Sequence, residues 1–279
     1  MSQLYERKGR INETGLINTE GVTEKFCFKD NKNCYLRKGE TIISRVTSGQ
    51  IPGEKYSGGR QKRHAIKRFE NRSNIWEHGV KYYFDYSITL TPTERTRKLV
   101  KEFEAAKKAW QQDTCVNFTK VDPPSEIEEK RDVLRVTAFE DGCASHPGKL
   151  GGEQPLILGE GCENFGHIAH ELGHALGLYH TMARHDRDSY VTVKPETMEK
   201  DYHVELKQQT EENNENYGLG YDYGSIMHYA SANAFSKGQP SIIPSDERYM
   251  STMGSEMISF LDFLLINKLY SCEGRKLDS

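Results

Sequence analysis

The sequence has no apolar run long enough to cross a membrane, and its opening residues lack the apolar stretch of a secretory leader peptide. The mean hydropathy is -0.76, and 35% of the residues are hydrophobic. We therefore expect no membrane span. A formal net charge of -3 gives no indication of nucleic-acid binding. A chain of 279 residues can still bury a sizeable core, so we expect one globular domain with an additional arm.

Cysteine is scarce, and its arrangement argues against a clustered metal site. The six cysteines include no C-x-x-C pair, and an even, unclustered set favours disulfides formed in an oxidising compartment. Spacing alone leaves all fifteen possible pairings open. Three glycosylation sequons are compatible with secretion; they begin at Asn12, Asn71 and Asn117. We therefore expect a secreted, extracellular protein whose leader peptide lies outside this sequence.

The most informative segment runs from His170 to His180 and reads H-E-x-x-H-x-x-G-x-x-H. On a helix, His170 and His174 face the same side about one turn apart. Gly177 lacks a Cβ, so it can take the positive φ that ends a helix and turns the chain, which brings His180 to the same point. Glu171 follows the first histidine, from where its carboxylate reaches a water on the metal. The pattern predicts a zinc site with three histidine ligands and Glu171 as general base.

The number of ligands distinguishes a catalytic zinc site from a structural one. Three protein ligands leave one position open to water, and zinc lowers the pKa of that water to about 7. The alternative is a buried amphipathic helix with hydrogen-bonded histidines, which explains the leucines but not the carboxylate between two imidazoles. We expect the nearby histidines not to be ligands; they are His167, His185 and His228.

A second segment, Ser225–Tyr229, reads S-I-M-H-Y and follows an aromatic run. Together with the long histidine motif, this segment resembles the astacin family of metzincin zinc endopeptidases, and the similarity extends from about Trp76 to Cys272. The resemblance implies that Met227 forms a hydrophobic floor beneath the metal. It also implies that the Tyr229 phenol ligates the resting zinc or stabilises the oxyanion of the reaction.

The same resemblance implies a two-lobed α+β catalytic domain with a twisted mixed sheet, an active-site helix and a mostly irregular C-terminal lobe flanking a groove. The implied activity is zinc-dependent hydrolysis of peptide bonds in extracellular proteins, with one Zn²⁺ per chain and an extended polypeptide as substrate. In related enzymes that polypeptide pairs with an edge strand, which we expect near residues 143–146. The implied disulfides join Cys115 to Cys272 and Cys143 to Cys162, which leaves Cys27 for Cys34.

One position departs from the family pattern. Astacins usually carry a glutamate directly after the third histidine, where it receives the buried amino terminus of the mature enzyme, but this chain has Thr181. A threonine here resembles a nematode subgroup that includes hatching and moulting enzymes. The departure weakens the expectation that activation requires burial of the new amino terminus.

The charge of the chain changes sign near residue 63. Residues 1–63 hold 13 Lys and Arg against 7 Asp and Glu, whereas the remainder holds 25 against 34. The division falls at an R-x-K-R run ending in Arg63, which resembles a proprotein convertase site; a solvated basic linker is the alternative. We therefore predict a pro-segment at 1–63 that a processing protease removes after Arg63, a catalytic domain at 64–273 and a tail at 274–279.

Latency in astacins usually comes from the aspartate of an F-x-G-D segment. The single aspartate before residue 63 is Asp30, and its surroundings lack the glycine of that segment. Asp30 is therefore a candidate latency ligand for the zinc, with a plain hairpin between Cys27 and Cys34 as the alternative.

Local patterns predict strands at residues 79–87, 115–121, 133–139, 143–146 and 155–158. A helix should begin at the Thr91-Pro92-Thr93-Glu94 cap and cover the sheet with a periodic apolar face. A polar, turn-rich segment should follow the histidine motif, before a final helix near residues 256–270.

Two alternatives from other classes are a catalytically inactive, zinc-stabilised extracellular binding domain and a secreted interaction module. The presence of Glu171 and Tyr229 argues against the first alternative. An open three-ligand site argues against the second, because an interaction module has no need of one.

Overall fold

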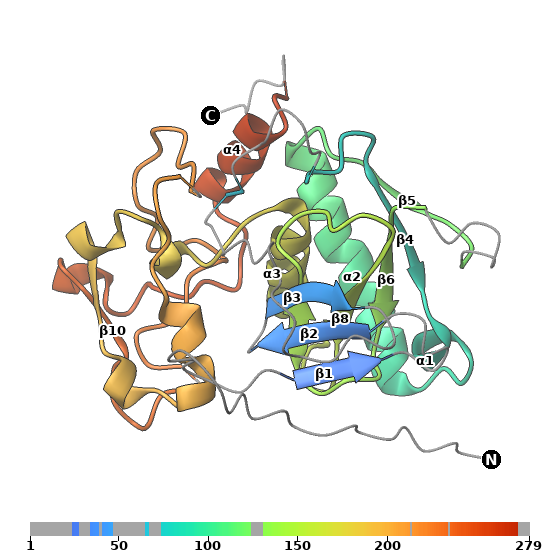
Figure 1. Cartoon of the computed structure of the whole chain (residues 1–279), viewed down its shortest axis with the longest axis horizontal. Helices are drawn as coiled ribbons and strands as arrows, with labels where there is room; N and C mark the ends of the chain where they lie inside the picture. Colours follow the sequence, from blue (N-terminus) through green and yellow to red (C-terminus); the bar gives the residue numbers. More distant parts are fainter. Residues whose placement is uncertain are drawn as a thin grey trace.

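The computed structural model describes residues 24–27, 34–38, 41–46, 65–66, 74–123, 131–212, 214–233 and 235–272. Figure 1 shows two lobes: one holds the sheet and the long helix α2, and the other holds short helices and loops from later in the sequence. Helix α3 (Phe165–Leu176) lies between them. The mixed sheet with few helices confirms the predicted α+β fold.

Eight strands of the described residues form one sheet in the order β1-β2-β3-β7-β8-β6-β4-β5. Their bounds are Glu24–Cys27, Cys34–Lys38, Thr41–Val46, Val80–Phe84, Phe118–Lys120, Val133–Thr137, Cys143–Ser145 and Glu153–Leu158 for β1 to β8. Strands β5, β4, β6 and β8 run parallel, and β7 pairs antiparallel with β8. All residues of β6 are buried, as expected for a central strand covered on both faces.

The prediction of an edge strand near residues 143–146 is wrong, because β7 lies between β3 and β8 in the sheet. Strand β3 pairs with it in parallel, with Thr41 opposite Ser145. The proline that follows His146 suits an edge strand, and the pairing partner was missed because it comes from about a hundred residues earlier in the chain. The N-terminal strands β1, β2 and β3 form an antiparallel meander that continues the sheet beyond β7 (Figure 1).

The helices begin at side-chain caps. The short α1 (Tyr86–Thr89) is capped by Asp85, and α2 (Glu94–Asp113) begins after Thr93 in a reciprocal capping box with Thr96. The buried face of α2 includes Leu99, Phe103, Ala106 and Trp110. The last helix, α4 (Phe260–Leu269), begins after Ser259, a few residues later than predicted. None of the helices in the described residues is long and apolar enough to cross a membrane.

The second lobe is built from short elements, as the turn-rich sequence predicted. Its elements are η2 (Thr181–Ala183), η3 (Arg187–Ser189), β9 (Val191–Val193), η4 (Pro195–Thr197), η5 (Lys200–Leu206), β10 (Ile242–Pro244) and η6 (Glu247–Tyr249). Strands β9 and β10 form a two-stranded antiparallel sheet. The lobe has its own buried cluster, which includes Met182, Met198, Leu206, Tyr221 and Tyr229.

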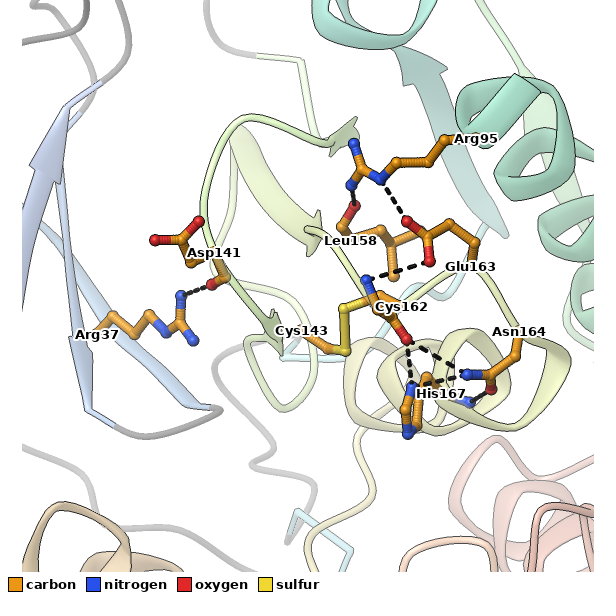
Figure 2. Close-up of a disulfide and its surroundings, with 10 residues drawn as sticks. Arg37, Arg95, Asp141, Cys143, Leu158, Cys162, Glu163, Asn164 and His167 are labelled. Atoms are coloured by element: carbon orange, nitrogen blue, oxygen red, sulfur yellow. Dashed lines mark hydrogen bonds and ion pairs between the residues drawn. A yellow bond between two sulfur atoms is a disulfide. The ribbon is translucent and has the colours of Figure 1, made fainter. Parts of the chain in front are cut away.

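The described residues contain two disulfides. Cys115, two residues after the end of α2, joins Cys272 just after α4, across a separation of 157 residues. Cys143 in β7 joins Cys162 in the loop before α3, as Figure 2 shows. Strand β1 places Cys27 opposite Cys34 of β2, but the side chains of this expected pair lie outside the described residues.

Candidate metal centre and active site

Helix α3 carries the first two histidines of the motif, and local signals set both of its ends. Asn164 caps the start, since its Oδ1 accepts the His167 amide hydrogen at 2.8 Å (Figure 2). Gly177 ends the helix in the left-handed region with φ 111°, as the motif predicted. The turn is closed by the Leu178 amide, which donates to the Gly173 carbonyl at 2.9 Å. The chain then reverses toward His180.

The carbonyl groups of the last turn of α3, which have no partners within the helix, are bound by other parts of the chain. The Gly148 amide donates to the His174 carbonyl at 2.8 Å. The Trp76 indole donates to the Ala175 carbonyl at 2.9 Å, and the Tyr270 hydroxyl donates to the Leu176 carbonyl at 3.1 Å. These bonds fix the end of the helix that presents His174.

The three motif histidines converge through their Nε2 atoms. His180 Nε2 lies 3.1 Å from His170 Nε2 and 3.2 Å from His174 Nε2. His174 and His180 are buried, and His170 is half-buried. Nitrogen ligands of a tetrahedral zinc ion stand about 3.3–3.4 Å apart when each Zn–N bond is about 2.0–2.1 Å. The observed separations are close to that spacing.

The Nδ1 atoms of the same histidines point away from the centre toward acceptors. His170 Nδ1 lies 2.8 Å from the Ile226 carbonyl oxygen, and His174 Nδ1 lies 2.8 Å from the Leu178 carbonyl oxygen. His180 Nδ1 lies 3.1 Å from Oε2 of Glu205. Since each acceptor holds a proton on Nδ1, each Nε2 presents a lone pair to the centre. Three lone pairs at this spacing repel one another unless a cation lies between them, so the site fits a zinc ion.

The segment Ser225–Tyr229 packs against this centre. Met227 is fully buried, and its sulfur lies so close to α3 that a Cβ on Gly173 would meet it at 2.7 Å. The Met227 carbonyl accepts the Thr181 amide hydrogen at 2.9 Å. Through the Ile226 and Met227 carbonyls, this turn therefore touches both His170 and the residue that follows His180.

Two further predicted residues lie beside the histidines. Glu171 is buried on α3, directly after His170. Tyr229 is buried too, and its ring centroid is 4.7 Å from that of His180. Thr181, which stands where the family usually has glutamate, is also buried.

The three other nearby histidines are engaged elsewhere. His167 bonds with Asn164 and Gly161 at the start of α3. The backbone amide and the ring Nδ1 of His185 both bond with Oδ1 of Asn214. His228 bonds with the Tyr221 hydroxyl at 2.8 Å, and burial lowers the pKa of its imidazole to about 4. Within the described residues, the group that could hold a metal ion consists of His170, His174 and His180.

Asp30, Arg63, Asn12 and Asn71 lie outside the described residues. Asn117 is described, and it is exposed just before β5.

The structure brings in three residues that the sequence reasoning missed. Glu205 contacts His180, and Gly173 leaves space for Met227. Asp262 at the start of α4 accepts from the Ser225 hydroxyl at 2.6 Å and from the Ile226 amide at 2.9 Å. A signal for Asp262 was available, because Ser259 and Asp262 form a capping box that can be read from sequence.

The family model for the astacin peptidases matches residues 68–271. The chain belongs to the astacin family. Among curated relatives, this astacin domain is 39% identical over 215 residues to zinc metalloproteinase nas-31 of Caenorhabditis elegans, covering 77% of this chain and 33% of that protein. It is 36% identical over 248 residues to zinc metalloproteinase nas-32 of the same organism, covering 86% of this chain and 34% of that protein.

A solved structure has the same fold. High choriolytic enzyme 1, a hatching enzyme zinc-protease from the medaka Oryzias latipes, matches with a TM-score of 0.63 and 30% identity, covering 75% of this chain and all of that one. One catalytic zinc ion is the cofactor of the family, and the three histidines fit it. The chain spans about a third of the length of the curated relatives it matches.

Proposed function

We propose that this astacin domain is a secreted zinc-dependent endopeptidase that hydrolyses peptide bonds of extended extracellular polypeptides. The observation that carries the proposal is the convergence of three Nε2 atoms, two of them 3.1 and 3.2 Å from the third, beside a buried glutamate on the same helix. A structural zinc site would be closed by a fourth protein ligand. Among the described residues, the metal-binding group consists of three histidines.

Each catalytic role falls to a residue at this centre. Zinc bound by His170, His174 and His180 would supply a Lewis acid and lower the pKa of a bound water to about 7. Glu171 accepts a proton from the attacking water and delivers it to the amine nitrogen of the leaving peptide. Tyr229 donates its phenol hydrogen to the oxyanion that develops on the scissile carbonyl.

Met227 has a supporting role beneath these groups. Its side chain fills the space against Gly173, and its carbonyl holds the Thr181 amide. It forms the apolar floor that keeps the imidazoles in place and excludes water from below.

A peptide-cleavage assay on the form beginning at His64 tests this activity. Glu171→Gln should keep zinc but lose about 10²–10⁴-fold in kcat, because the proton acceptor is gone. Glu160→Gln is the matched control, since it removes an exposed carboxylate shortly before α3. If the zinc-loaded protein cleaves no peptide of a broad library, the alternative of an inactive, zinc-stabilised extracellular binding domain replaces the proposal.

The N-terminal segment is proposed to be an inhibitory pro-segment that is removed by cleavage after Arg63. Support comes from the pairing of β3 with β7, the strand on which related enzymes bind an extended peptide. The Arg37 side chain adds a hydrogen bond to the Asp141 carbonyl at 2.7 Å, seen in Figure 2. The Tyr35 hydroxyl donates to the Glu153 carbonyl at 2.8 Å. A strand that occupies this position excludes a substrate from it.

Comparing cut and uncut protein tests the inhibitory role. Arg63→Gln should block processing and leave the protein inactive, and cleavage at an inserted site for another protease should restore activity. Asp30→Ala in the uncut protein separates the two proposed causes of inhibition, which are ligation of zinc by Asp30 and occupation of β7 by β3. If this variant cleaves peptide, inhibition is due to Asp30, and if it does not, inhibition is due to the paired strands. Full activity of the uncut Arg63→Gln protein would contradict both causes.

A further inference from the structure

The acceptor on the third histidine differs in kind from the acceptors on the first two. His170 and His174 bond through Nδ1 to backbone carbonyls, whereas His180 Nδ1 lies 3.1 Å from a carboxylate oxygen of Glu205. Both partners of this contact are almost fully buried, with 3% and 1% of their side-chain surfaces exposed. A carboxylate carries a negative charge that a carbonyl lacks, so it makes the imidazole a stronger electron donor.

The helix that carries Glu205 is fastened next to the segment that follows His180. Glu205 belongs to η5, and the carbonyl of its neighbour Leu206 accepts from the Arg187 guanidinium. The same nitrogen of Arg187 donates to the Met182 carbonyl in η2 at 3.0 Å. The Gln209 amide, just beyond η5, donates to the Ala183 carbonyl at 2.9 Å. The distance between Glu205 and His180 is therefore set by backbone anchors.

Burial of the carboxylate also has an energetic consequence. A carboxylate removed from water raises the free energy of the folded state unless positive charge compensates it. A divalent cation held at Nε2 of His180 supplies that charge through the imidazole ring. The metal and Glu205 therefore stabilise each other across the ligand.

We propose that Glu205 is the positioning residue of the zinc site, fixing the tautomer and orientation of His180 and strengthening its bond to the metal. Glu205 does not touch the substrate or the reacting atoms. The proposal rests on the zinc site and not on peptidase activity, so a failure of the proposed enzymatic function would leave it intact.

Metal binding by the full chain tests this role without an activity assay. Glu205→Gln keeps the shape and an acceptor oxygen but removes the charge, and Glu205→Leu removes both. Zinc affinity, measured by competition with a chromophoric chelator, should fall about 10-fold in the first variant and about 100-fold in the second. Glu199→Gln, which removes an exposed carboxylate next to the same short helix, should leave the affinity unchanged.

Two further readouts distinguish positioning of a ligand from general support of the fold. The visible absorption spectrum of the Co²⁺-substituted protein should change in Glu205→Gln, because it reports on the ligand field. The rise in Tm on adding Zn²⁺ should shrink, while the Tm of the metal-free protein should hold or increase as a buried charge disappears. Wild-type zinc affinity and an unchanged Co²⁺ spectrum in Glu205→Gln would overturn the proposal. A lower metal-free Tm with unchanged affinity would overturn it too, assigning Glu205 a purely structural role.

Discussion

Asp262 should make the stability of this domain depend on pH in a direction opposite to that of most surface carboxylates. The side chain is fully buried at the start of α4, and burial raises its pKa from 3.8 to about 6. Hydrogen bonds from Ser225, Ser259 and Ile226 act in the opposite direction but do not offset the loss of water, and the charge of Asp222 adds to the rise. The folded state therefore binds this proton more tightly than the unfolded chain does.

The sign and size of the effect follow from that difference. One pKa unit corresponds to about 1.4 kcal/mol, so protonation of Asp262 favours the folded state by about 3 kcal/mol. This contribution is fully present below about pH 4, where the unfolded chain is also protonated. It disappears as the pH rises through about 6, where the folded carboxyl group ionises.

Urea unfolding at pH 4, 5, 6 and 7 measures the effect, with chelator present so that the metal does not contribute. Asp262→Asn is the reference, because an amide does not titrate and other groups cancel in the comparison. Between pH 4 and 7 the wild type should lose about 2.4 kcal/mol of unfolding free energy relative to Asp262→Asn, slightly less than the full difference because the unfolded carboxyl group is already partly ionised at pH 4. If the unfolding free energies of the two proteins changed in parallel with pH, the argument would be refuted, because Asp262 would then have the same pKa in the folded and unfolded states.

Two further changes test the packing of α3 against Met227 and the stabilisation that the longer disulfide provides. Gly173→Ala should destabilise the protein by about 1–3 kcal/mol in thermal unfolding, because the added Cβ would lie 2.7 Å from the sulfur of Met227. This clash should outweigh the helix propensity of alanine, which favours the helix by about 1 kcal/mol relative to glycine. An increase in Tm would contradict this account. Replacing Cys115 and Cys272 by serine should reduce the unfolding free energy by about 5 kcal/mol, since their disulfide closes a loop of 157 residues. Urea midpoints equal to the wild type would show that the unfolded chain gains no freedom when this loop is opened.

Elements with local signals were predictable from the sequence. The Thr93 cap and the periodic apolar residues predicted α2, and the spacing of the motif predicted both the convergence of its histidines and the turn at Gly177. The β7 prediction failed because strand pairing joins residues distant in sequence, and Thr41 lies opposite Ser145. The position of an edge strand therefore depends on segments that a local pattern does not include.

The partners of the zinc ligands show why the remainder of the site was not predictable. Two of the three Nδ1 acceptors are backbone carbonyls, and every residue type has one, so Ile226 and Leu178 leave no signature in the sequence. The third acceptor, Glu205, lies in a polar segment that also contains the exposed Glu199 and Glu211. Composition cannot separate a buried carboxylate from exposed ones in such a segment, because all of them suit a solvated surface equally well. Glu205 comes next to His180 because the turn at Gly177 directs the chain toward His180 and because backbone hydrogen bonds hold η5 beside it. The acceptor on the third histidine is therefore determined by tertiary contacts and not by the local sequence.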